Sequence, residues 1–174
     1  MQFKTLHGAT KRLVKSHQYN IDWNAPSRSK LQYKVKKSLE KIWVNNIVLE
    51  EMPVVGTKLS LDFYNANKKI AIEVQGRQHN QYVPHFHGNN KINFISQLRR
   101  DHQKKEFCEI NNITLIELYE EDDLSASGIE SVIKINVLNS VDRQTSVTAD
   151  NIEFRNIETV TIQSSQDKNC KILF

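Results

Sequence analysis

Two short segments in which apolar and polar residues alternate strictly place the strongest constraint on how this chain folds. They are residues 59–64 (LSLDFY) and 69–75 (KIAIEVQ), and the second runs into Gly76. The segment between them, residues 65–68 (NANK), is rich in turn-forming side chains. Successive side chains of a β-strand point to opposite faces. The sequence therefore predicts a β-hairpin in which each strand has one apolar and one polar face.

The polar face of this hairpin carries two acidic side chains, Asp62 and Glu73, followed by Gln75. A turn centred near residues 66–67 places Asp62 opposite position 71, so that Glu73 is its diagonal neighbour. Carboxylates this close repel each other unless a proton or cation intervenes. Mg²⁺ binds one or two carboxylates and keeps waters, and it can activate a water and stabilise charge on a scissile phosphate. The alternative is an ordinary solvent-exposed hairpin face.

Three kinds of side chain suited to phosphate chemistry follow the hairpin. His79 comes six residues after Glu73, and imidazole is the natural group to move a proton near neutral pH. Asp101 falls on a later predicted helix, where it can orient His79 or a metal-bound water, while Arg100 or Lys104 engages phosphate. The alternatives are a solvent-exposed loop histidine and an exposed Asp101–Lys104 pair one helical turn apart.

The distribution of charge favours a polyanionic partner. The 174 residues carry a net charge of +4, but residues 1–45 hold ten basic and two acidic residues, and the remainder holds fourteen basic and eighteen acidic ones. A basic segment on a mildly acidic body is typical of proteins that bind DNA or RNA, although a solvated helix face gives the same pattern. The sequence contains no apolar run long enough for a membrane helix, and its first residues are followed by no apolar stretch that we expect to serve as a signal peptide. We therefore expect an intracellular, cytoplasmic protein without a membrane partner.

The remaining patterns divide the chain into a basic N-terminal arm at 1–26, a core at 27–124 and a β-rich C-terminal extension at 125–174. Leu31, Val35 and Leu39 recur at helical spacing behind a serine cap. The elements predicted for the core are, in chain order, a helix after Ser27 or Ser29, a strand at 47–55, the hairpin, a helix at 92–111 and a strand at 113–118. This order predicts an α/β core.

Several motifs in this order resemble a known family. They are a helix with S-x-x-Q, then LDFY at 61–64, IEVQGRQH at 72–79, RRDHQKK at 99–105 and ITLIEL at 113–118. Over roughly residues 27–120 the chain resembles the PD-(D/E)xK nuclease superfamily, and within it the very-short-patch-repair-like branch and its EDxHD homing-endonuclease relatives. The resemblance implies a restriction-endonuclease-like mixed central sheet flanked by helices. It also implies an endonuclease that hydrolyses DNA phosphodiesters with Mg²⁺ or Mn²⁺, by nicking or by double-strand cleavage.

The resemblance assigns roles to five residues. Asp62 is the central metal ligand, and Glu73 is the acidic residue of the E-x-K element and a second metal ligand. Gln75 stands where the superfamily more often has Lys. His79 matches the family histidine, as a general base or a group behind the metal ligands, and Asp101 matches the final acidic position.

One departure from the family concerns the first helix. Relatives carry Glu there in an S-x-x-E setting, whereas this chain has Gln32, with Glu40 eight residues on as a substitute. Six basic residues are expected to contact DNA: Lys30, Lys34, Lys37, Arg77, Arg100 and Lys104. The departure leaves open a catalytically weak or inactive nucleic-acid-binding module on the same scaffold.

Two further features have no assigned role. His85 and His87 share a face if they lie on a strand and so can hold Zn²⁺, but no nearby third ligand has fitting spacing. A loop that contacts DNA or covers the site is the favoured interpretation. The C-terminal segment 128–174 is a candidate interface for a homodimer. A phage-encoded protein acting inside the host cell is one biological setting that suits such an enzyme.

Overall fold

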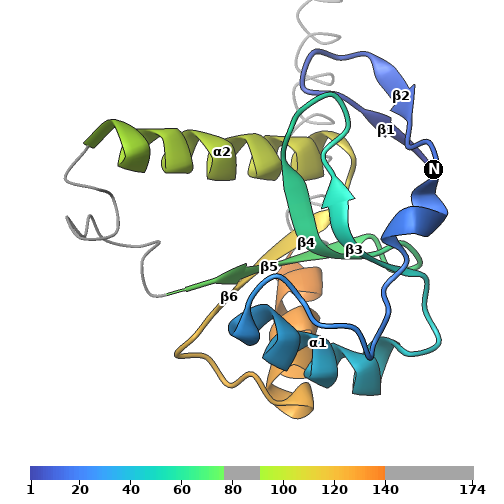
Figure 1. Ribbon diagram of the computed structural model, residues 1–174, viewed down its shortest axis with the longest axis vertical. Coiled ribbons are helices and arrows are strands. Elements are labelled where there is room, and N and C mark those ends of the chain that lie inside the picture. The colour runs from blue at the N-terminus through green and yellow to red at the C-terminus, as the bar shows by residue number, and fades with distance from the viewer. Residues whose placement is uncertain (77–90, 140–174) are drawn as a thin grey trace, which may run out of the picture. The chain divides into compact units, whose positions relative to one another are not determined.

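The computed structural model describes residues 1–76 and 91–139 (Figure 1). One compact unit, Met1–Lys134, contains the elements named here. In chain order they are β1 (Gln2–Lys4), β2 (Thr10–Arg12), the 3-10 helix η1 (Ser16–Tyr19), α1 (Lys30–Trp43), β3 (Val48–Pro53), β4 (Ser60–Asn65), β5 (Ile70–Gln75), α2 (Lys91–Ile110) and β6 (Thr114–Tyr119). In the described part of the chain no helix is long and apolar enough to cross a membrane.

The central sheet has the strand order β3-β4-β5-β6. The first two pairings are antiparallel and the third is parallel, so α2 is the crossover between β5 and β6. The predicted hairpin is confirmed as β4 and β5, and the predicted mixed α/β architecture is confirmed with it. Phe63, Ile72 and Ile116 are buried on these strands and form part of the core.

The register of the hairpin differs from the prediction. The paired residues are Asn65↔Ile70, Tyr64↔Ala71 and Phe63↔Ile72, so continuing the register places Asp62 opposite Glu73 rather than opposite position 71. The turn has the expected four residues but is displaced by one position, to residues 66–69. Within it, the Asn65 side-chain oxygen accepts hydrogen bonds from the backbone N–H groups of Asn67 and Lys68. The two carboxylates are therefore direct neighbours, not diagonal ones.

Helices cover both faces of the sheet (Figure 1). Helix α1 begins at its predicted cap, because the Ser29 side chain accepts a hydrogen bond of 3.0 Å from the Gln32 backbone N–H. It buries Val35, Leu39 and Trp43. Helix α2 packs against the other face through Phe107, which is fully buried.

The short strands β1 and β2 form an antiparallel pair that is attached to the core by Phe3. The Phe3 ring lies 6.0 Å from Tyr64 and 5.7 Å from Phe107, measured between ring centroids. Farther along, Asn20 forms an isolated bridge with Leu49 of β3. The N-terminal residues thus contribute to the same hydrophobic core as the sheet and α2.

The prediction of β structure after residue 125 is wrong where the structure describes it, because residues 126–139 are helical. Ser125 caps this helix by accepting a hydrogen bond from the Gly128 backbone N–H. Ile129 and Ile133, four residues apart, are both buried, so packing of one helical face outweighs the strand preference of β-branched residues. Residues 140–174 of the predicted extension lie outside the described residues.

Candidate functional site

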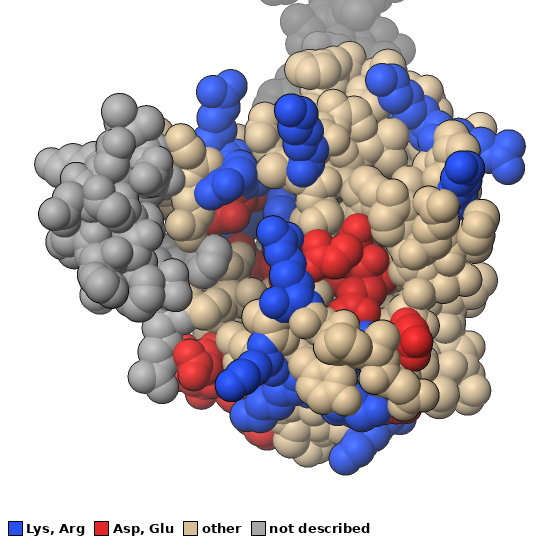
Figure 2. Space-filling view, in the orientation of Figure 1, with Lys and Arg blue, Asp and Glu red and all other residues tan. Residues whose placement is uncertain are grey.

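Four acidic residues lie in a row across the sheet, one on each strand: Glu51, Asp62, Glu73 and Glu117. Glu73 and Glu117 are partners in the parallel β5–β6 pairing. The register of β3 and β4 places Glu51 opposite Asp62, although that pair is not formed. Figure 2 shows acidic side chains gathered near the middle of one face, with basic side chains around them. The sequence predicted only the two central members of this row.

Asp62 and Glu73 replace the backbone ladder where β4 and β5 separate. The Val74 backbone N–H donates to Asp62 Oδ2 at 2.8 Å, and the Asp62 backbone N–H donates to Glu73 Oε1 at 3.2 Å. In each bond, a side-chain carboxylate oxygen accepts the backbone N–H of the neighbouring strand, where a backbone carbonyl would accept it in a regular ladder. These two bonds fix both side chains rigidly, with the two carboxyl groups on adjacent strands.

Burial makes this pair of carboxyl groups easy to protonate. Burial, and then the charge of Asp62, raise the pKa of Glu73 to about 7, although Lys104 acts in the opposite direction. Burial also raises the pKa of Asp62, against the hydrogen bond from Val74 and the charge of Lys104. Near neutral pH the pair therefore has affinity for a proton or for a cation that stabilises both negative charges.

Helix α2 supplies basic partners to two members of the row. Lys104 Nζ lies 2.5 Å from Glu73 Oε2, and Lys105 Nζ lies 3.1 Å from Glu117 Oε2. Lys104, one of the residues predicted to contact DNA phosphate, has its ammonium against Glu73 in the structure. Arg100 is exposed on the same helix.

A pocket of about 210 Å³ lies between α2 and the ends of β5 and β6, and its lining includes Glu117 of the acidic row. Two predicted site residues, Gln75 and Asp101, line it together with His102 and Tyr119. Gln75 is 5% exposed. The structure thus brings Gln75 and Asp101 together in a pocket whose described lining includes Glu117 but neither Asp62 nor Glu73.

The two helix-1 candidates have different surroundings. Gln32 is 3% exposed, and its Nε2 donates a 3.2 Å hydrogen bond to Glu51 Oε1. Glu40 instead forms an ion pair with Lys37 on the helix surface. Sequence reasoning missed Glu51. The signal was the pair of adjacent acids at positions 50 and 51 of a predicted strand, which interrupts the alternation of apolar and polar side chains.

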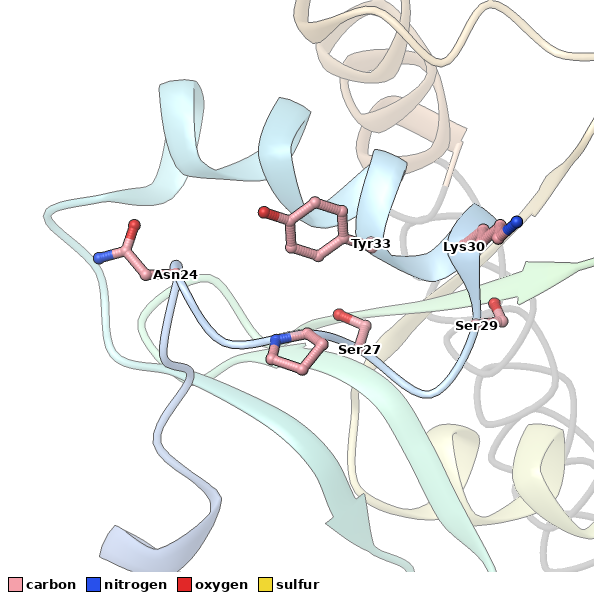
Figure 3. Close-up of a pocket in the computed structure, with 6 residues that line it drawn as sticks. Asn24, Ser27, Ser29, Lys30 and Tyr33 are labelled. Carbon is pink, nitrogen blue, oxygen red and sulfur yellow. The ribbon is translucent and has the colours of Figure 1, made fainter.

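The predicted DNA-binding residues of α1 differ in their surroundings. Lys30 lines a second pocket, of about 340 Å³, with Tyr33 and Ser29 at the start of the helix (Figure 3). Lys34 is exposed, and the Lys37 ammonium also donates to the backbone oxygen of Trp23. The other predicted residues, Arg77, His79, His85 and His87, lie outside the described residues.

The donor set suits a hard divalent cation to a limited extent. Asp62 Oδ1 makes no hydrogen bond within the described residues, and carboxylate oxygens together with water are the ligands that Mg²⁺ prefers. No group of three or more His, Cys, Asp or Glu side chains in residues 1–76 and 91–139 is placed to hold a metal ion. The fit is therefore to a cation held by two carboxylates, Asp62 and Glu73, with water completing its shell.

Comparison with known proteins finds viral relatives. The chain is 37% identical over 84 residues to the uncharacterized protein 307L of invertebrate iridescent virus 6, covering 48% of this chain and 42% of that protein. It is 42% identical over 82 residues to the uncharacterized protein 094L of frog virus 3 (isolate Goorha), covering 47% and 51%. The match thus spans about half the length of these relatives. No family model and no solved structure matches the chain.

Proposed function

We propose that this protein is a divalent-metal-dependent DNA endonuclease of the PD-(D/E)xK type, with a restriction-endonuclease-like core. One observation carries most weight: the buried Glu73 and the half-buried Asp62 lie on adjacent strands and are fixed by hydrogen bonds to the backbone. Burying two like charges side by side is costly without a cation or proton between them. The motifs that resemble the nuclease superfamily include both residues, and this coincidence supports the assignment.

In this proposal each residue of the site has a distinct task. Asp62 and Glu73 hold Mg²⁺ or Mn²⁺, which when bound lowers the pKa of a water and stabilises charge on the phosphate. Lys104 stabilises Glu73 as a carboxylate and, at the same place, meets the negative charge of the DNA backbone. Gln75 and Asp101, which line the pocket between α2 and the ends of β5 and β6, orient a bound nucleotide or water. His79 remains the proposed general base.

DNA is held, in this proposal, by basic residues on both helices. Lys30, Lys34 and Lys37 extend from α1, Arg100 from α2, and Arg77 follows β5 in sequence. Such contacts contribute affinity that does not depend on base sequence and that falls steeply with salt. The viral relatives support a virus-encoded enzyme that acts inside the infected cell.

A cleavage assay with matched variants tests the proposal. Purified protein is incubated with supercoiled plasmid and with branched DNA in the presence of Mg²⁺, Mn²⁺ or EDTA. We expect metal-dependent nicking or linearisation by the wild-type chain and at least a roughly 100-fold loss in Asp62→Asn and Glu73→Gln. The exposed control Glu121→Gln removes the same charge and should cleave normally. Equal cleavage by Asp62→Asn and wild type, or no cleavage of any substrate, refutes the proposal.

The second candidate is a nucleic-acid-binding module without catalysis. It is favoured by the absence of a three-ligand metal cluster in the described residues and by Lys104, whose ammonium already provides a positive charge beside Glu73. DNA binding that weakens steeply between low and moderate salt, without cleavage under either metal, would identify this function. A homodimer through the C-terminal segment is a separate proposal that sedimentation analysis can test.

A further inference from the structure

Glu51 has a backbone conformation that residues with side chains rarely adopt. Its φ is +52°, in the left-handed region, although it lies in the middle of β3. The pairs on either side, Glu50↔Phe63 and Met52↔Leu61, are both formed. The backbone therefore leaves the ladder at this single residue, opposite Asp62. Such conformations persist where the surrounding structure enforces them, and they are concentrated at functional sites.

The carboxylate of Glu51 is fixed from two elements. Gln32 Nε2 of α1 donates to Oε1 at 3.2 Å, and Ser60 Oγ of β4 donates to Oε2 at 2.7 Å. Gln32 is almost completely buried, so its amide is committed to this bond. The Glu51 side chain is nevertheless 32% exposed, so water reaches it. The carboxylate is thus held in place and is still accessible to solvent. Its partner Ser60 lies on β4, two residues before Asp62.

Negative charge is least compensated at this end of the acidic row. Glu73 and Glu117 are paired with lysines of α2. The one ion pair that Glu51 makes among the described residues is a 3.5 Å contact with Arg28, whose side chain is 76% exposed, and such a pair contributes little. The charge of Glu51 also acts on Asp62. A cation bound at Asp62 therefore meets a second, preorganised negative group.

We infer that Glu51 is a further residue of the proposed site, which accepts hydrogen bonds from the water shell of a divalent cation held by Asp62 and Glu73. Gln32 and Ser60 act as positioning residues for its carboxylate. The inference rests on the proposed function. It accounts for the neutral Gln32 on the first helix, because the carboxylate missing from the helix is supplied by the strand residue to which Gln32 donates. Contact through water also agrees with the lack of a three-ligand cluster among the described residues.

Binding of Mn²⁺ to the full chain without DNA tests this role separately from catalysis. Isothermal titration calorimetry would compare wild type with Glu51→Gln, Asp62→Asn, the control Glu121→Gln, and the exchange variant Gln32→Glu/Glu51→Gln. We expect Glu51→Gln to weaken Mn²⁺ binding roughly 10- to 100-fold, the effect typical of groups that orient metal-bound ligands. Glu121→Gln should bind as wild type does. The exchange variant should regain most of the affinity, because it returns one carboxylate to the same hydrogen-bonded pair.

The outcomes separate the two proposals. If Asp62→Asn loses Mn²⁺ binding while Glu51→Gln equals Glu121→Gln, Glu51 has no part in the site and the proposed function still stands. An exchange variant that stays as weak as Glu51→Gln also overturns the inference. Wild type that does not bind Mn²⁺, or Asp62→Asn that binds it equally well, overturns the metal-dependent function itself. Thermal denaturation of each variant confirms that the compared proteins are folded, and the exchange variant decides the question if Glu51→Gln unfolds.

Discussion

The buried Glu73 carboxyl group should make the stability of this protein fall as the pH rises. The pKa of this group is raised from 4.5 to about 7 in the folded chain, chiefly by burial and then by Asp62. The folded state therefore binds the proton more tightly than the unfolded state. The stabilisation is complete below about pH 4.5 and is lost as the pH rises through about 7. At 1.36 kcal/mol per pKa unit, the change amounts to about 3 kcal/mol.

Urea unfolding at a series of pH values measures this change. The free energy of unfolding of wild type is compared with that of Glu73→Gln, which cannot titrate at this position, between about pH 4.5 and pH 8. We expect the free energy of unfolding of wild type, relative to that of Glu73→Gln, to fall by about 3 kcal/mol as the pH rises over this range. The exposed substitution Glu121→Gln should leave the wild-type profile unchanged. A difference that stays constant with pH refutes the reasoning, because it means that burial does not raise the pKa of Glu73.

Three further predictions concern the stability and reactivity of the core. Lys36 is fully buried and donates to Glu50 Oε2 at 2.7 Å, so Lys36→Met should lower the free energy of unfolding by about 3–5 kcal/mol in urea denaturation, and more than Glu50→Gln does. Ser29→Ala should cost about 1 kcal/mol by removing the cap of α1, whereas Ser29→Asp should restore it; equal stability of the two variants would contradict the capping role. Burial raises the pKa of Cys108 to about 12, so in a Cys170→Ser background a thiol reagent at pH 8 should label the protein only after denaturation, and rapid labelling of the native protein would refute this.

Most elements of the core could be predicted because their periodicity is local. The alternation at 59–64 and 69–75 predicted β4 and β5, and the helical spacing behind Ser29 predicted α1. The helix at 126–139 could not be predicted in this way. Its Val and Ile residues favour strands when read one by one, and only the burial of Ile129 and Ile133 against the rest of the unit selects the helix.

The candidate site could be predicted in part. Asp62 and Glu73 follow from the alternation, since both belong to the polar face of the hairpin. Their direct opposition does not, because it depends on the hydrogen bonds that Asn65 makes within the turn. The partnership of Lys104 with Glu73 spans 31 residues, and no local pattern specifies which turn of α2 lies over which residue of β5.

The sequence alone determined that this chain forms a hairpin with a polar, acidic face, flanked by helices and followed by a further strand. Those features arise from side-chain periodicity and turn chemistry, which act over a few residues. Only the tertiary structure decided which acids are neighbours and which are neutralised. In that structure Glu51 leaves the β3 ladder and accepts a hydrogen bond from Gln32, and Lys104 lies against Glu73. Electrostatic interactions act through space between distant segments, so their balance is fixed only when helices and sheet are packed together.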